Sequence, residues 1–123
     1  METIQRTPTR EKTGLWLYKI IAGLLIVVLL GLHFVVNHLV APTGLLSWAD
    51  VVAYYQNPII PIIEIVFLIV VISHALIGLR SILLDLNPPA RLLHYLDIFF
   101  VLLGIGASAY GIWLVMVVVS FGR

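Results

Sequence analysis

The residues of this sequence best suited to chemistry lie in one stretch near its middle, Ser73–Asp85. The stretch closes a long apolar run and contains His74, which is followed four residues later by Gly78. In a helix, residues four apart lie on the same face, so His74 and Gly78 would be neighbours. A histidine at membrane depth is costly to bury, which makes a functional role the first hypothesis for it. The missing side chain at Gly78 would let a flat, bulky group approach the backbone beside the imidazole.

Two polar residues of the same stretch extend this interpretation. Arg80 and Ser81 lie about 9–10 Å beyond His74 along a helix axis, roughly the reach from the iron of a haem to its propionates. Arg80 carries a fork of donors that suits carboxylates, although it points about 120° away from His74. Ser81 lies almost directly above His74. The stretch is therefore interpreted as one wall of a haem pocket in a bilayer, and the alternative is a packing histidine hydrogen-bonded between helices.

His33 is the second candidate haem ligand. It lies deeper in its apolar run than His38, which is nearer the end of that run and is expected at the wetted interface. His94 is also expected at an interface. Counted from one end of their spans at about 1.5 Å per residue, His33 and His74 differ in depth by only about 5 Å. Spacing alone therefore leaves open one haem bound by both histidines or two separate haems.

A group of polar residues around the junction of the second and third apolar runs is a candidate quinone site. Asp85, Arg91 and Tyr95 lie there, with Asp97 close behind. Their polar groups would fix quinone oxygens in otherwise apolar surroundings, and the alternative is a solvated, helix-capping rim. Glu64 is expected within the first turn of the second run, where the helix dipole favours a negative charge. A role for it in a proton path is the alternative.

The composition places these candidates in a membrane. The chain has 123 residues, of which 62% are hydrophobic and 11% are charged, whereas soluble domains carry about 25% charged residues. The absence of cysteine excludes disulfides, iron–sulfur ligation and thiol nucleophiles from this chain. Redox chemistry would then need histidine ligands or a bound organic cofactor. The net charge of +1 makes nucleic acid an unexpected partner.

Three long apolar runs must position the candidate residues. They extend from Leu15 to about Leu39, from Ile59 to about Leu84, and from Ala90 or Arg91 to about Phe121. Each is long enough to span a bilayer, and the first is longer than the core of a cleaved signal peptide. The sequence therefore predicts an all-α membrane protein, with a tail over residues 1–14 and one three-helix domain over residues 15–123.

Shorter features complete the expected fold. Ser47 followed by Asp50 resembles a capping box and predicts a short interfacial helix that continues to about Gln56. Trp16 and Tyr18 are expected as interfacial anchors, and Lys19 is expected to extend toward the headgroups. The third run also carries small residues at spacings that let helices pack closely in lipid; these are Gly104, Ala107, Ser108 and Gly111.

The distribution of basic residues predicts an orientation. Arg6, Arg10 and Lys12 precede the first span, and Arg80 and Arg91 flank the junction of the second and third spans. The segment between the first and second spans has no lysine or arginine. The positive-inside rule then puts the amino terminus and the second junction on the cytoplasmic side and the carboxyl terminus outside, in a multi-pass protein of the cell inner (plasma) membrane.

The stretch from His74 to Asp85 resembles the second transmembrane helix of the small cytochrome b-type anchor subunit of succinate dehydrogenase and fumarate reductase (complex II). In that family a haem-ligating histidine is followed by glycine after four residues and by aspartate after eleven, as at His74, Gly78 and Asp85. One-haem anchors commonly place a tyrosine quinone ligand directly after this aspartate. This chain has Leu86 there, which leaves Tyr95 as a substitute.

The first run adds to the resemblance. The segment from Gly23 to His33 is similar to the first span of two-haem anchors, in which a histidine binds the haem farther from the catalytic subunits. His33 matches that position and His38 does not. The resemblance implies two b-type haems and a quinone, shared with a second membrane anchor subunit, and further partners in an iron–sulfur subunit and a flavoprotein subunit.

The implied function is to anchor a succinate:quinone oxidoreductase and to support electron transfer between its iron–sulfur clusters and quinone. This chain alone would not oxidise succinate. The alternative is a membrane scaffold or assembly subunit whose histidines are structural. A transporter is disfavoured, because three spans with one internal acid offer no evident substrate path.

Overall fold

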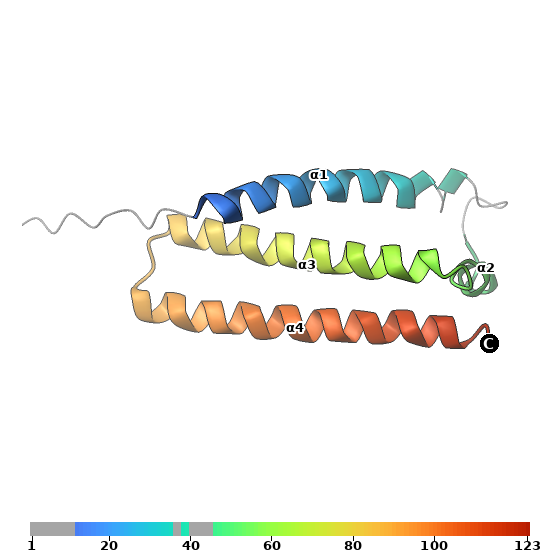
Figure 1. Cartoon of the computed structure of the whole chain (residues 1–123). Helices are drawn as coiled ribbons and strands as arrows, with labels where there is room; N and C mark the ends of the chain where they lie inside the picture. Colours follow the sequence, from blue (N-terminus) through green and yellow to red (C-terminus); the bar gives the residue numbers. More distant parts are fainter. Residues whose placement is uncertain (1–11, 36–37, 40–45) are drawn as a thin grey trace, which may run out of the picture.

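The computed structural model describes residues 12–35, 38–39 and 46–123 of the chain. These residues form four helices and no strand: α1 (Thr13–Val35), α2 (Trp48–Tyr54), α3 (Ile59–Asp85) and α4 (Ala90–Ser120) (Figure 1). Three of them, α1, α3 and α4, are long and apolar enough to cross a membrane. The predicted all-α fold with three spanning helices and one short helix is therefore confirmed.

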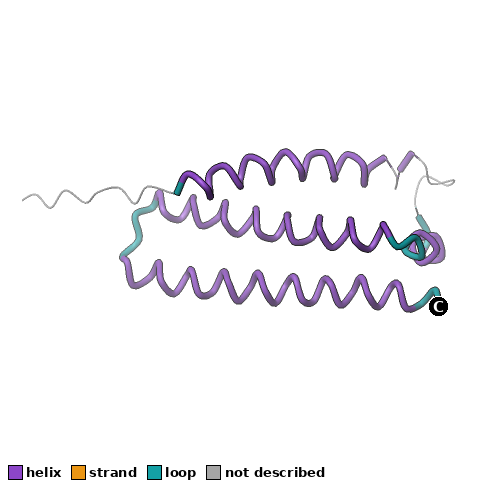
Figure 2. The backbone as a smooth tube through the Cα atoms, in the orientation of Figure 1, coloured by secondary structure: helices purple, strands orange, loops and turns teal. Residues whose placement is uncertain are grey.

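The three long helices lie side by side, with α3 between α1 and α4 and in contact with both (Figures 1 and 2). Successive long helices run in opposite directions. The start of α1, the end of α3 and the start of α4 therefore share one end of the bundle, called here the turn end. The short helix α2 lies across the opposite end, called here the α2 end, where the chain also finishes.

Small residues on α4 allow it to pack closely on α3. A Cβ atom added at Gly104 would lie 3.0 Å from a methyl group of Leu76. One added at Gly111 would overlap the side chain of Leu68. Leucine side chains of α3 therefore fill gaps over α4 glycines, as the small-residue spacing predicts.

The predicted cap of α2 is present. The Ser47 amide donates to Oδ2 of Asp50 at 2.8 Å, and the Asp50 amide donates to the Ser47 hydroxyl at 3.3 Å. Hydrogen bonds from the side chain and backbone of Ser47 also hold the pKa of the Asp50 carboxyl below its ordinary value. The helix ends at Tyr54, two residues before the predicted end, and the side-chain amide of Gln56 then donates through Nε2 to the carbonyl oxygen of Val119 at 3.3 Å. That bond ties α2 to the end of α4.

The junction between α3 and α4 ends one helix and begins the next as predicted. Asn87 has a φ of 51°, in the left-handed region that asparagine tolerates better than most residues. Its amide donates to the carbonyl oxygen of Leu84 at 2.9 Å, which closes the last turn of α3. Pro89 is then the N-cap of α4.

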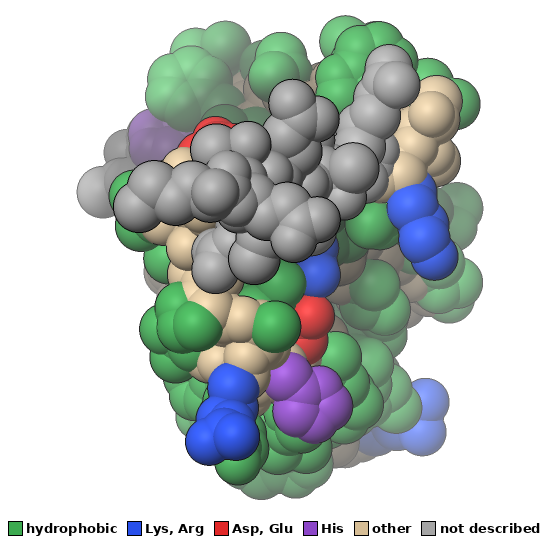
Figure 3. Space-filling view, turned by 90° about the vertical axis from the view of Figure 1, so that its left-hand side faces the viewer, with side chains coloured by type: hydrophobic (Ala, Val, Ile, Leu, Met, Phe, Trp, Pro, Cys, Tyr) green, Lys and Arg blue, Asp and Glu red, His purple; other side chains and the backbone are tan. Residues whose placement is uncertain are grey.

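Very little of the bundle is buried within this one chain. Among the described residues, the buried apolar side chains are Ala22, which is 3% exposed, and Phe100, which is 8% exposed. Figure 3 looks onto the turn end and shows lysine or arginine, acidic and histidine side chains among hydrophobic ones. An apolar surface of this extent requires lipid or partner helices to cover it.

Candidate functional site

His74 points from α3 toward α1, where the fold makes room for its ring. A Cβ atom added at Gly23 would lie 3.3 Å from Cε1 of His74, so the imidazole fits against α1 because position 23 has no side chain. Nδ1 of His74 is buried and has no hydrogen-bond partner among the described residues. Leaving a buried polar group unpaired costs about 1–3 kcal/mol. This geometry lacks the interhelical hydrogen bond of the packing alternative and suits a histidine that binds a ligand.

The space beside Gly78 is open. A Cβ atom added there would have no atom within 4 Å, in agreement with the room that the sequence suggested at this position. The glycine in contact with the imidazole is nevertheless Gly23, which sequence reasoning did not select as a site residue. The contact between Gly23 and His74 could have been predicted only from the pairing of the two helices, because antiparallel packing of α1 and α3 brings position 23 level with position 74.

Ser81 lies on the same side of α3 as His74, as its seven-residue separation predicts. The ammonium group of Lys19 donates to the Ser81 hydroxyl at 2.8 Å, and that hydroxyl donates to the carbonyl oxygen of Ile77 at 3.0 Å. Lys19 thus extends along α3 and meets a polar side chain, whereas the sequence suggested headgroup contact. We call the line formed by Lys19, Gly23, His74 and Ser81 the α1–α3 seam.

The hydroxyl of Tyr18, expected at the interface, also reaches α3. It forms a hydrogen bond with the Ser73 hydroxyl. Ser73 in turn donates to the carbonyl oxygen of Ile69 at 2.7 Å. This bond and the one from Lys19 attach the first two turns of α1 to the middle and end of α3, on either side of His74.

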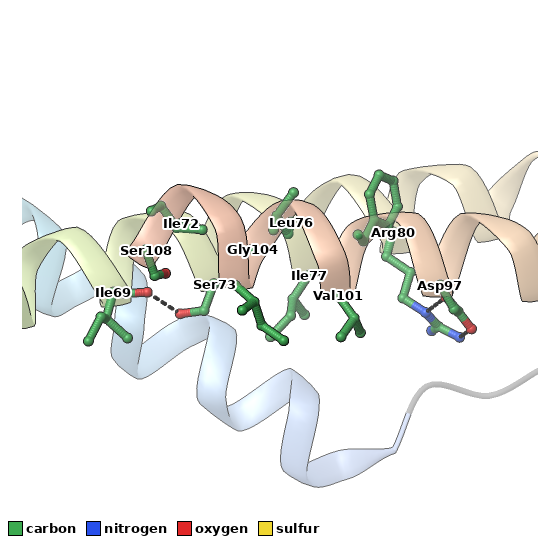
Figure 4. A pocket seen from close by; sticks show the side chains of 12 residues that line it. Ile69, Ile72, Ser73, Leu76, Ile77, Arg80, Asp97, Val101, Gly104 and Ser108 are labelled. Carbon is green, nitrogen blue, oxygen red and sulfur yellow. Dashed lines mark hydrogen bonds and ion pairs between the residues drawn. The ribbon is translucent and has the colours of Figure 1, made fainter. Parts of the chain in front are cut away.

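Arg80 faces α4 and lies outside the seam. Its Nε atom donates to Oδ1 of Asp97 at 2.6 Å and a terminal nitrogen donates to Oδ2 at 3.0 Å, which makes a bidentate ion pair. The pair lines one end of a cavity of about 540 Å³ between α3 and α4, and Ser73 and Ser108 line the other end (Figure 4). Arg80 and His74 therefore point to different sides of α3, as the offset of about 120° predicted from the sequence implies. The sequence analysis did not identify Asp97 as the partner of Arg80.

His33, in the last turn of α1, lies beside Glu64 of α3. The distance from its Nδ1 to Oε1 of Glu64 is 3.5 Å, and 48% of the His33 side chain is exposed. The two residues line a cavity of about 230 Å³ together with Tyr54 and Phe67. The placement of Glu64 in the first turn of its helix was wrong, because α3 begins at Ile59 and has no acidic residue in that turn. The Glu64 carboxylate therefore lies next to His33 and not at the amino end of α3.

The two candidate ligands lie at different levels of the bundle. His33 is level with Glu64, and His74 is level with Gly23. Since Glu64 and His74 are ten residues apart on α3, the two histidines are separated by about 15 Å along the axis. The estimate of about 5 Å from the sequence was wrong, because it assumed that the two spans begin level with each other. One iron atom bound by both histidines does not fit this geometry.

The predicted quinone residues lie exposed at the turn end. Asp85, Arg91 and Tyr95 are all exposed, and none of them lines either of the two cavities described above.

The ring of His94 lies 6.1 Å from that of Tyr95, measured between ring centroids. His38 stacks on Phe34 with ring centroids 4.7 Å apart and is exposed. The described residues contain no group of three or more His, Cys, Asp or Glu side chains that could together hold a metal ion.

Comparison with known proteins now identifies the family. The family model for succinate dehydrogenase/fumarate reductase transmembrane subunits matches residues 3–122 of this chain. The chain belongs to this family. It is thus a multi-pass membrane anchor subunit, which confirms the family resemblance of the His74–Asp85 stretch.

One curated relative supports the assignment. The succinate dehydrogenase hydrophobic membrane anchor subunit of Archaeoglobus fulgidus is 38% identical to this anchor subunit over 76 residues, which make up 62% of this chain. The match spans 64% of the relative, slightly less than two thirds of its length. A comparison with solved structures found no match.

Proposed function

We propose that this anchor subunit attaches a succinate dehydrogenase or fumarate reductase to the membrane and holds a b-type haem through His74. Family membership supports the anchoring role. The observation that carries the haem proposal is the buried Nδ1 of His74, which has no hydrogen-bond partner among the described residues. The open space beside Gly78 and the polar Ser81 two turns away are consistent with a flat group that carries carboxylates.

The residues described above could form one side of a haem-binding site. His74 would supply one ligand to the iron, and a second membrane anchor subunit would supply another. A bound haem would add one-electron chemistry between iron–sulfur clusters and quinone. Gly23 fixes the position of the His74 ring at its edge, and the apolar helix surfaces around it exclude water. Ligand identity and burial are the means by which such a site sets a reduction potential.

His33 would bind a second haem near the α2 end. Its half-exposed ring is accessible to a partner subunit, and the separation of about 15 Å from His74 leaves room for two groups. The Glu64 carboxylate beside Nδ1 would orient the ring and favour ligation through the other nitrogen, as outer carboxylates do for metal-bound histidines. Two haems per complex is therefore the version of the proposal that the geometry supports better.

Quinone would bind near the turn end, where Asp85, Arg91 and Tyr95 lie. The iron–sulfur and flavoprotein subunits would dock at the same end, on the cytoplasmic side of the plasma membrane, because basic residues gather there and the positive-inside rule applies. In this orientation the carboxyl terminus lies outside. Most of the proposed cytoplasmic tail, residues 1–14, lies outside the described residues.

The His74→Ala variant tests the central proposal. In the purified complex, pyridine haemochrome analysis should show the loss of one haem, while succinate oxidation with a soluble dye acceptor should persist in the catalytic subunits. His94→Ala, which removes an exposed histidine at the turn end, is the matched control and should retain the full haem content. An unchanged haem content in His74→Ala would refute the ligand assignment. A wild-type complex without haem would favour the scaffold function, with structural histidines.

A further inference from the structure

Lys19 lies on the same seam as the proposed haem ligand. It precedes Gly23 by one helical turn, so both face α3, and Gly23 is the residue against which the His74 ring packs. The Lys19 ammonium donates to the Ser81 hydroxyl at 2.8 Å. Ser81 is two turns beyond His74, about 10 Å along the axis. A cation and a hydroxyl from two different helices thus meet at the distance from His74 where haem carboxylates would lie.

Arg80 is less suitable for this role. Its guanidinium faces α4 and already makes two hydrogen bonds to the Asp97 carboxylate. Binding a second carboxylate would require it to leave this bidentate partner and to cross to the other side of α3. The loss would leave Asp97, whose side chain is 38% exposed, without its charged partner.

We propose that Lys19, together with Ser81 and in place of Arg80, receives a propionate of the haem bound by His74. The proposal rests on the haem-binding function proposed above and adds one residue to it. Lys19 is an anion-binding residue of α1, and the Arg80–Asp97 pair is a structural link between α3 and α4. The Lys19 ammonium and the Ser81 hydroxyl are already in contact, so a propionate could bind there while the ion pair between Arg80 and Asp97 stays intact.

The test measures the midpoint potential of the haem in the purified complex by optical redox titration. Lys19→Gln should shift the potential of the His74-dependent haem to more negative values, because removing a nearby positive charge favours the ferric state. Lys19→Arg, which keeps the charge, should restore the wild-type value. Lys12→Gln removes the same charge about 10 Å earlier along the helix axis and should leave the potential unchanged.

A double variant separates Lys19 from Arg80. Arg80→Gln with Asp97→Asn removes the ion pair without changing the net charge, and it should leave the midpoint potential at the wild-type value. Haem present in normal amounts with an unshifted potential in Lys19→Gln would overturn the Lys19 assignment alone. A shift in the double variant as large as that in Lys19→Gln would also overturn it. Absence of haem from the wild-type complex would overturn both this inference and the haem-binding proposal.

Discussion

At the scale of single residues, the polar side chains of this subunit divide into two sets with different partners. Lys19 and Ser81 meet on the side of α3 that faces α1, where His74 also lies. Arg80 and Asp97 meet on the side that faces α4. The first set contains a buried imidazole nitrogen that has no partner among the described residues, whereas the second set forms a closed bidentate pair. Ligand binding is therefore expected on the α1 side.

The closed pair gives a prediction about stability. Replacing Arg80 by Met or Asp97 by Leu should each lower the free energy of unfolding by about 1 kcal/mol, because the remaining partner loses its ion pair but is still partly solvated. The double variant should lose less than the sum of the two. Since each side chain of the pair is about one third exposed, the coupling should be modest, about 1 kcal/mol.

A double-mutant cycle on the complex in detergent micelles, followed by chemical unfolding, measures this coupling. Strictly additive single effects would show that the pair contributes nothing beyond its separate side chains. A matched cycle with Lys12 and Asp85, which are exposed charged residues at the same end of the bundle, should show no coupling.

The sequence selected His74 and Ser81 for the same face of one helix because both lie on a single element with a known period. It did not select Gly23, Lys19 or Asp97 as partners. Those contacts depend on the register between helices, and no local spacing encodes it. The same limit explains why the depths of His33 and His74 were misjudged, since counting from each span's own end ignores the offset between spans.

At the scale of elements, the α3–α4 interface depends on glycines that face leucines. Gly111→Leu should weaken this packing, because even a Cβ atom at position 111 overlaps the Leu68 side chain. Gly106→Leu is a matched control on the same helix, since a Cβ atom there would have no neighbour within 4 Å. The expected cost at position 111 is about 1–3 kcal/mol, the usual effect of overpacking.

The thermal midpoint of the purified complex compares the two variants. Gly111→Leu should lower the midpoint clearly, and Gly106→Leu should leave it near the wild-type value. Equal midpoints for the two variants would contradict close packing at Gly111. A fall confined to Gly106→Leu would indicate instead that a partner subunit covers that face of α4.

The element boundaries were largely predictable from the sequence. The apolar runs and the Asn87-Pro88-Pro89 segment placed both ends of α3 and the start of α4 within one residue, and the Ser47–Asp50 box placed the start of α2. The end of the first span is different: the expected boundary near Leu39 adjoins residues outside the described part of the chain, and α1 itself ends at Val35. Glu64 was misplaced although the start of α3 was predicted correctly, because it is the sixth residue of the helix and therefore lies beyond the first turn.

At the scale of the whole molecule, the chain is a layer of three helices whose surface is apolar on nearly every side. Such a layer requires lipid or partner helices to cover it, since Ala22 and Phe100 are the buried apolar side chains among the described residues. The polar features lie toward the two ends. The turn end carries Lys19, Ser81 and the Arg80–Asp97 pair, and the α2 end carries the His33–Glu64 pair. The two ends therefore differ in charge and in chemistry.

This asymmetry gives a prediction about orientation that can be tested without haem. The chain has no cysteine, so single cysteines introduced into it can be labelled without background. Leu86→Cys lies in the α3–α4 junction, where Leu86 is 73% exposed, and Arg123→Cys lies at the α2 end. A membrane-impermeant thiol reagent added to intact cells should label Arg123→Cys only, because the positive-inside rule predicts that the basic turn end faces the cytoplasm. Labelling of Leu86→Cys should appear only after the membrane is made permeable. Labelling of Leu86→Cys alone in intact cells would show that the orientation is the opposite of the one proposed, and that the catalytic subunits cannot dock on the cytoplasmic side at the turn end.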